Sequence, residues 1–171
     1  MSVRRNACLA VALLAASFGC AGPQTARFYP ARALGQGDGY PAAVHQVKVA
    51  EQNVASVSVW TPGLYSLAEG QRPIIHVATL VRNTSAASIE LDSAASQIGV
   101  MTAPSAPPRV VRPYHVAGTA LVGAGQTQRV DAYYALPDGV AIGDIAGFYL
   151  SWELRTQTGA SAEYTPFVRV R

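Results

Sequence analysis

Alternation of apolar and polar side chains near the C-terminus is the feature that most constrains this chain. Within 146–155, Phe148, Leu150, Trp152 and Leu154 alternate with Tyr149, Ser151 and Glu153. A period of two residues is typical of a β-strand with one buried face, because a helix repeats every 3.6 residues. We therefore expect a strand here, with Phe148, Leu150 and Trp152 at the centre of the core.

Other segments of β character follow one another at spacings near ten residues, and turn residues separate them. These segments are 45–49, 56–60, 74–82, 88–92, 97–102, 110–116, 128–136 and 164–170. The second is expected to end at Thr61-Pro62-Gly63, and the segment 110–116 to lie at a sheet edge because Pro113 cannot donate a ladder hydrogen bond. After residue 43 no segment of helical period reaches ten residues. This spacing favours an all-β antiparallel sandwich.

The first residues are typical of an export signal. Arg4 and Arg5 precede the apolar run 7–18, which is too short to cross a bilayer. The following Gly19-Cys20 resembles the lipobox of bacterial lipoproteins. That resemblance implies that residues 1–19 are removed and that Cys20 is acylated, which anchors the chain in a membrane. Two alternatives stay open: ordinary secretory cleavage after Ala21, and a buried N-terminal helix.

Residues 20–43 are expected to form a flexible linker that carries the lipidated Cys20, and residues 44–171 the folded domain. The segment is rich in Ala, Gly, Pro and Gln, with Gly35-Gln36-Gly37-Asp38-Gly39 at its centre, and it has no sustained periodicity. Of the two cysteines, Cys8 lies in the signal. No disulfide is therefore expected within the mature chain.

Charge argues against nucleic-acid binding. The 171 residues contain 13 Lys and Arg and 10 Asp and Glu, but Arg4 and Arg5 belong to the signal, which leaves a net charge near +1. The remaining arginines are scattered, whereas nucleic-acid binding requires a clustered basic face.

Several motifs are similar to the small immunoglobulin-like domains of bacterial exported lipoproteins of unassigned function. The similarity covers about residues 70–155, with Ala124 in place of a proline in one turn. The motifs are Val81-Arg82-Asn83-Thr84-Ser85, Ile89-Glu90-Leu91-Asp92, Gly125-Gln126-Thr127 and Tyr134-Ala135-Leu136-Pro137. The resemblance implies an immunoglobulin-like β-sandwich of about eight strands in the bacterial cell envelope, facing the periplasm or the cell surface. It brings no catalytic residue.

Catalytic or metal chemistry has only weak candidates. His45, His76 and His115, with Met101, are one set that would bind copper. The acid pairs Glu90 with Asp92 and Asp131 with Asp144 are the candidates for acid–base work. No nucleophile elbow, phosphate-binding loop or dinucleotide fingerprint is present. We therefore expect no enzyme activity, no metal and no cofactor, with a copper-handling protein or envelope enzyme as the alternative.

Three tyrosines are the best candidates for a binding face. By alternation Tyr133 and Tyr149 point away from the expected core, and Tyr164 opens the last strand. Outward tyrosines on a sheet form contact surfaces for partners. The sequence thus favours a membrane-tethered, non-catalytic sandwich that binds another envelope protein or a surface glycan.

Overall fold

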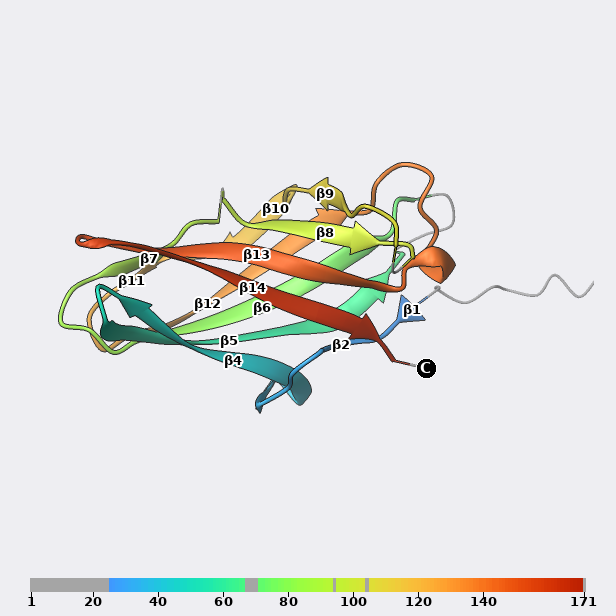
Figure 1. The fold of residues 1–171 in the computed structure, drawn as a ribbon. Coiled ribbons are helices and arrows are strands. Elements are labelled where there is room, and N and C mark those ends of the chain that lie inside the picture. The colour runs from blue at the N-terminus through green and yellow to red at the C-terminus, as the bar shows by residue number, and fades with distance from the viewer. Residues whose placement is uncertain (1–24, 67–70, 94, 104, 171) are drawn as a thin grey trace, which may run out of the picture.

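Nearly all regular structure in this protein is β-strand. The computed structural model describes residues 25–66, 71–93, 95–103 and 105–170 (Figure 1). The expected signal peptide and Cys20 lie outside the described residues. Two antiparallel sheets pack face to face, so the predicted β-sandwich is confirmed. In the described ranges the helical structure consists of one 3-10 turn, η1 (Ile142–Asp144).

The sheet that contains β5 is called sheet A, and its order is β10-β12-β6-β5-β4-β3, with β1 paired to the end of β5. Its strands are β1 (Thr25–Ala26), β3 (Gly35–Gly37), β4 (Tyr40–Val49), β5 (Gln52–Tyr65), β6 (Ile74–Asn83), β10 (His115–Gly118) and β12 (Thr127–Ala135).

The facing sheet is called sheet B, and its order is β11-β7-β13-β14-β2, with β8 also paired to β13 and β9 paired to β8. Its strands are β2 (Phe28–Pro30), β7 (Ile89–Leu91), β8 (Gln97–Met101), β9 (Arg109–Val111), β11 (Leu121–Val122), β13 (Gly147–Thr156) and β14 (Gly159–Arg169).

The order of the strands is that of an immunoglobulin sandwich. In sheet A, β10-β12-β6-β5 take the places of strands D-E-B-A, and in sheet B, β9-β8-β13-β14 take those of C′-C-F-G. Followed through these eight strands alone, the chain crosses between the sheets after β6, after β9 and after β12, which gives the Greek-key path. Strands β4 and β3 extend sheet A beyond β5. The topology therefore supports the immunoglobulin-like fold independently of any sequence motif.

The core lies between the sheets, where the alternating strand β13 places it. Phe148, Leu150 and Trp152 are each at most 2% exposed, as predicted. The Phe148 ring stacks on Phe167 at 4.6 Å and meets Phe28 edge-on at 5.4 Å. Burying an aromatic side chain of this size contributes about 2–3 kcal/mol, and its aromatic contacts add to that.

The expected linker over 20–43 is wrong from Thr25 onward, and the domain begins well before residue 44. Strand β2 pairs with β14, and Phe28, only 1% exposed, belongs to the core. Strands β3 and β4 form a hairpin whose turn residues Asp38 and Gly39 have φ of 50° and 81°. An Asp-Gly pair with both φ values positive is typical of a type I′ turn. The pairing partner of β2 lies at the far end of the chain, where no local periodicity can reveal it.

Two expected strand boundaries also differ. Strand β5 does not end at Thr61-Pro62-Gly63 but runs on to Tyr65 through a bulge between Trp60 and Gly63, a position that tolerates proline. The segment 110–116 is not one strand. It divides around Pro113 into β9, at the edge of sheet B, and β10, at the edge of sheet A, so its edge location is confirmed.

Replacing the central core residue tests this architecture. Trp152→Ala is expected to lower the free energy of unfolding by about 3–5 kcal/mol, because it leaves a cavity between the sheets. Urea denaturation followed by circular dichroism measures the change. Leu34→Ala is the matched control, since Leu34 is 61% exposed and its truncation is expected to cost less than about 0.5 kcal/mol. Equal effects of the two substitutions would contradict the assigned core.

Candidate functional site

An aromatic row crosses the outer face of sheet A. Strand β12 places Tyr133 opposite His76 of β6 on one side and His115 of β10 on the other. The ring of Tyr133 stacks on His76 at 4.5 Å with an interplanar angle of 13°, and its centroid lies 5.5 Å from that of His115. The three side chains, which we call the aromatic row, therefore form one continuous surface over three strands.

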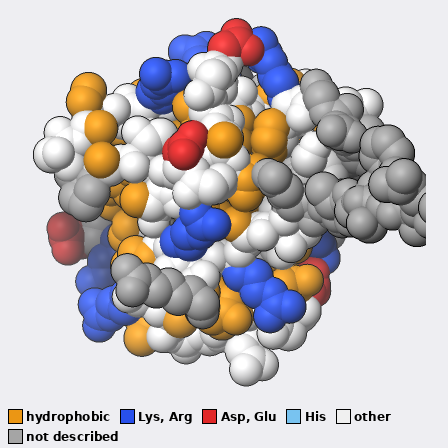
Figure 2. Space-filling model, turned by 90° about the vertical axis from the view of Figure 1, so that its right-hand side faces the viewer, with side chains coloured by type: hydrophobic (Ala, Val, Ile, Leu, Met, Phe, Trp, Pro, Cys, Tyr) orange, Lys and Arg blue, Asp and Glu red, His pale blue; other side chains and the backbone are white. Residues whose placement is uncertain are grey.

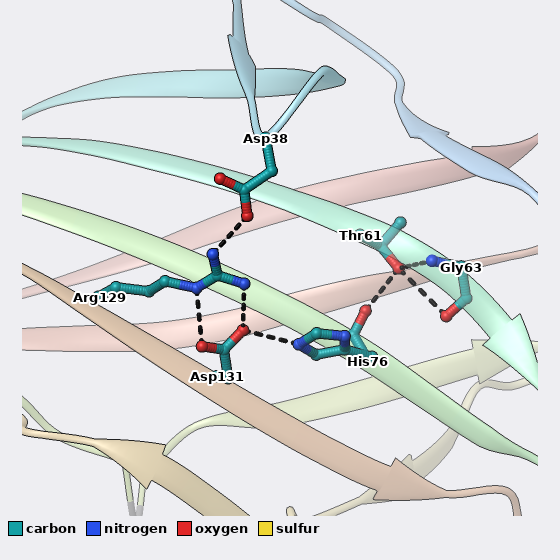
Figure 3. A network of polar contacts seen from close by, with 6 residues as sticks. All are labelled: Asp38, Thr61, Gly63, His76, Arg129 and Asp131. Atoms are coloured by element: carbon teal, nitrogen blue, oxygen red, sulfur yellow. Dashed lines mark hydrogen bonds and ion pairs between the residues drawn. The ribbon is translucent and has the colours of Figure 1, made fainter.

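Asp131 links this row to a cation. Its carboxylate oxygen Oδ1 lies 2.7 Å from Nε2 of His76 and accepts a 2.8 Å hydrogen bond from Nη2 of Arg129, while Oδ2 accepts a 2.7 Å bond from Arg129 Nε (Figure 3). Partial burial opposes ionisation of Asp131, but the hydrogen bonds from Arg129 and His76 outweigh it and lower the pKa of the carboxyl. The carboxylate is thus charged at neutral pH and fixed in position.

Arg129 also holds the β3–β4 hairpin against this face. Its guanidinium forms an ion pair with Asp38 at the tip of the turn (Figure 3). The same group lies 5.5 Å from the centroid of the Trp60 ring. Gly37 covers the indole so closely that a Cβ atom there would lie 2.4 Å from the ring. Trp60 is therefore only 2% exposed, and its Nε1 has no hydrogen-bond partner among the described residues.

A small cavity of about 160 Å³ borders this network where β5 changes its neighbour. Strand β4 pairs with β5 as far as Val59, and β1 pairs with it only from Leu64 onward. The cavity lies at this unpaired part of β5. It is lined by Arg27, Phe28, Tyr29, Gly39, Tyr40, Pro41, Thr61 and Pro62. The Thr61 hydroxyl accepts a 3.0 Å hydrogen bond from the Gly63 amide and donates one of 2.6 Å to the His76 carbonyl, which fixes the bulge (Figure 3).

The predicted face of three tyrosines is divided between the two sheets. Tyr133 lies on the outer face of sheet A, whereas Tyr149 and Tyr164 lie on adjacent strands of sheet B with their rings 4.9 Å apart. Tyr149 lies over Gly99, whose absent side chain leaves room for the ring. Alternation correctly placed Tyr133 and Tyr149 away from the core, but it cannot tell which sheet a strand joins.

His45 is separated from the other two histidines and lies partly buried at the edge of the core. Its Nε2 is 3.0 Å from the Thr165 hydroxyl, which accepts a 3.2 Å bond from Trp152 Nε1, and its Nδ1 is 3.6 Å from Glu163. Because the indole only donates, the Thr165 proton is available to Nε2 of a neutral His45. Burial lowers the pKa of His45, and attraction to Glu163 only partly offsets this.

The copper and acid–base candidates do not assemble into a site. Tyr133 stands between His76 and His115, and in the described part of the chain no three His, Cys, Asp or Glu side chains are grouped to hold a metal ion. Arg155 forms an ion pair with Asp92 and lies opposite Glu90.

The members of the other acid pair have different partners. Asp131 binds Arg129 and His76, while Asp144 accepts a hydrogen bond from the Ala141 amide of its own turn. Cys20 lies outside the described residues.

Sequence reasoning missed Asp38 and Trp60 as parts of this site. The Asp38-Gly39 dipeptide is a strong hairpin signal, and it was available in the sequence. The contact of that turn with Arg129 spans 91 positions, and no sequence pattern points to it.

Comparisons with known proteins give no information on the role of the site. No family model and no curated protein matches the chain. One solved structure, an uncharacterized β-sandwich protein from Clostridium difficile 630, is similar over 62% of this chain and 83% of its own, with 12% identity and a TM-score of 0.34. The fold assignment therefore rests on the strand order itself. In the described ranges no helix has the length and apolar character needed to cross a bilayer.

The partly buried His45 makes stability depend on pH. Its pKa is lower in the folded state than the value near 6.5 of an unfolded chain, so the unfolded state binds the proton first as pH falls. The stabilisation is complete above about pH 6.5 and is lost as the pH falls toward the folded-state pKa. His45→Gln is expected to flatten the fall in unfolding free energy between about pH 7.5 and 5.5, measured by urea titration. The exposed His115→Gln is the control; an unchanged slope in His45→Gln would exclude this origin.

Proposed function

We propose that this chain is an exported bacterial lipoprotein, anchored through an acylated Cys20, whose β-sandwich binds a surface glycan without catalysing a reaction. The observation that carries the proposal is the aromatic row beside the fixed Asp131–Arg129 pair on one rigid sheet. Flat aromatic rings cover the C–H faces of sugars, and charged planar groups hydrogen-bond their hydroxyls. A few oriented polar groups among aromatic side chains are typical of small-molecule recognition.

Among the described residues no hydroxyl or thiol is hydrogen-bonded to the side chains of the His76–Asp131 pair, and this supports a non-catalytic role. Catalytic triads need a hydroxyl or thiol within hydrogen-bond reach of the imidazole nitrogen that does not contact the acid. Within the described ranges no Ser or Thr hydroxyl forms a hydrogen bond with Nδ1 of His76. The pair instead orients the ring that stacks on Tyr133.

An envelope protein bound to sheet B is the second candidate. The outer face of that sheet exposes Tyr164 by 54% and Val168 by 49% on β14, and the edge strand β9 exposes Val110 by 52%. Apolar side chains with this exposure are typical of contact surfaces between proteins. The two candidates use opposite faces of the sandwich, so single substitutions separate them.

Removing the acylated thiol tests the anchor. In Cys20→Ser the protein is expected in the soluble envelope fraction, because each buried CH₂ of an acyl chain contributes about 0.8 kcal/mol to membrane binding. Fractionation and intact-mass spectrometry measure this, with Ser17→Ala as a control that keeps the thiol. A Cys20→Ser protein that stays in the membrane, with no acyl mass on the natural chain, would overturn the lipoprotein assignment.

Removing the central ring of the aromatic row tests whether this face binds a glycan. The full chain carrying Cys20→Ser is screened on an array of bacterial surface polysaccharides, and the affinity for each hit is measured by calorimetry. Tyr133→Ala is expected to weaken binding at least tenfold, as the loss of a central aromatic contact does. Tyr149→Ala, on the opposite sheet, is the matched variant and should leave glycan affinity unchanged. If only Tyr149→Ala weakens glycan binding, the glycan site lies on sheet B and not on the aromatic row. If the protein binds no polysaccharide, the glycan assignment is overturned.

A further inference from the structure

The position of the first strand limits how far the sandwich lies from its anchor. This step rests on the proposed acylation of Cys20. Five residue steps separate Cys20 from Thr25, where β1 begins, and they span at most about 18 Å. In Figure 1, β1, η1 and the end of β14 lie at the same end of the sandwich, which we call the anchor end. This end is therefore held close to the bilayer.

Arginines gather at the anchor end. Arg27 connects β1 to β2, Arg72 precedes β6, Arg109 begins β9 and Arg169 ends β14. Figure 2 views this end and shows Lys and Arg side chains spread across it, together with fewer Asp and Glu side chains and with uncharged and hydrophobic ones. All four arginines lie at the end of the sandwich to which the proposed lipid is attached.

The arginine contacts leave a positive balance on the anchor end. Arg72 forms an ion pair with Asp138, and Arg109 donates a 3.0 Å hydrogen bond to the carbonyl of the same residue. Arg169 donates to the carbonyls of η1, including that of Gly143 at 2.7 Å. Among the described residues, Asp138 and Asp144 are the acids that lie beside these four arginines, so two negative charges accompany four positive ones.

The opposite end carries the reverse balance. The β4–β5 turn, β7 and the paired ends of β13 and β14 meet there (Figure 1). Its acidic residues outnumber its basic ones: Glu51, Glu90, Asp92 and Glu153 against Lys48, Arg82 and Arg155. The long axis of the sandwich is therefore electrically polarised, with the positive end at the anchor.

We propose that the anchor end lies directly on the headgroups of anionic phospholipids. Arginine binds phosphate through two parallel hydrogen bonds, and a basic surface is attracted to a negatively charged leaflet. The attraction acts over about 10 Å at ordinary salt, a range comparable with the reach of the short connection to Cys20. The sandwich then stands upright on the membrane, with its acidic end outward.

The orientation of the sandwich relative to the membrane is measured with two variants, each of which carries one introduced thiol. In the lipidated chain Cys20 is blocked by its acyl group, so Gly143→Cys at the anchor end or Thr158→Cys at the opposite end supplies the single site for a fluorophore. Both positions are exposed, and Gly143 has open space at its Cβ position. The labelled lipoprotein is reconstituted into vesicles of phosphatidylcholine alone or mixed with phosphatidylglycerol, each with a quencher on the headgroups.

Quenching at position 143 is expected to exceed that at 158 by about fivefold or more in phosphatidylglycerol vesicles, and to fall with added salt or in neutral vesicles. Arg27→Gln with Arg72→Gln should reduce the difference, and the matched pair Arg82→Gln with Arg155→Gln should not. Equal quenching at both positions in acylated protein would overturn the upright orientation and leave the anchor intact. If quenching at 143 does not change with salt concentration or with lipid charge, the proposed contact with anionic headgroups is overturned. A natural chain without acyl mass would overturn both proposals.

Discussion

Packing of the apolar face of β13 against sheet A is the interaction on which the rest of the structure depends. Phe148, Leu150 and Trp152 occupy the inner face, and the same alternation that buries them directs Tyr149 and Ser151 outward. Because side chains of a strand point alternately to its two faces, no strand can supply the core without also defining an outer surface. The same rule on β12 buries Val130 and Tyr134 and places Arg129, Asp131 and Tyr133 together on the outside.

Local alternation made much of the sandwich predictable from the sequence. It identified the inner residues of β13 and the outward direction of Tyr133 on β12. It failed over 25–43, where strands of two or three residues are too short to show a period and depend on distant partners. Pro62 was misread for a related reason, because a bulge relieves the requirement for its missing N–H.

The candidate site could be predicted only within single strands. Arg129, Asp131 and Tyr133 follow one another at a period of two, so their shared face was evident. The contributions of His76, Asp38 and Trp60 come from other strands, and only the register of the sheet brings them together. For the same reason the sequence grouped Tyr133 with Tyr149 and Tyr164, which the fold places on opposite surfaces.

The short strands β1 and β2 have a mechanical consequence for a chain held at its N-terminus. If the proposed acylation of Cys20 holds the chain, tension would enter at Thr25 and run along two strands that pair with β5 and β14, one in each sheet. A pull parallel to paired strands loads their hydrogen bonds together instead of opening them in succession, and Phe28 must leave the core before the segment detaches. With that anchor, the segment that the sequence predicts as a flexible linker would instead resist extraction of the domain, because β1 and β2 pair with both sheets.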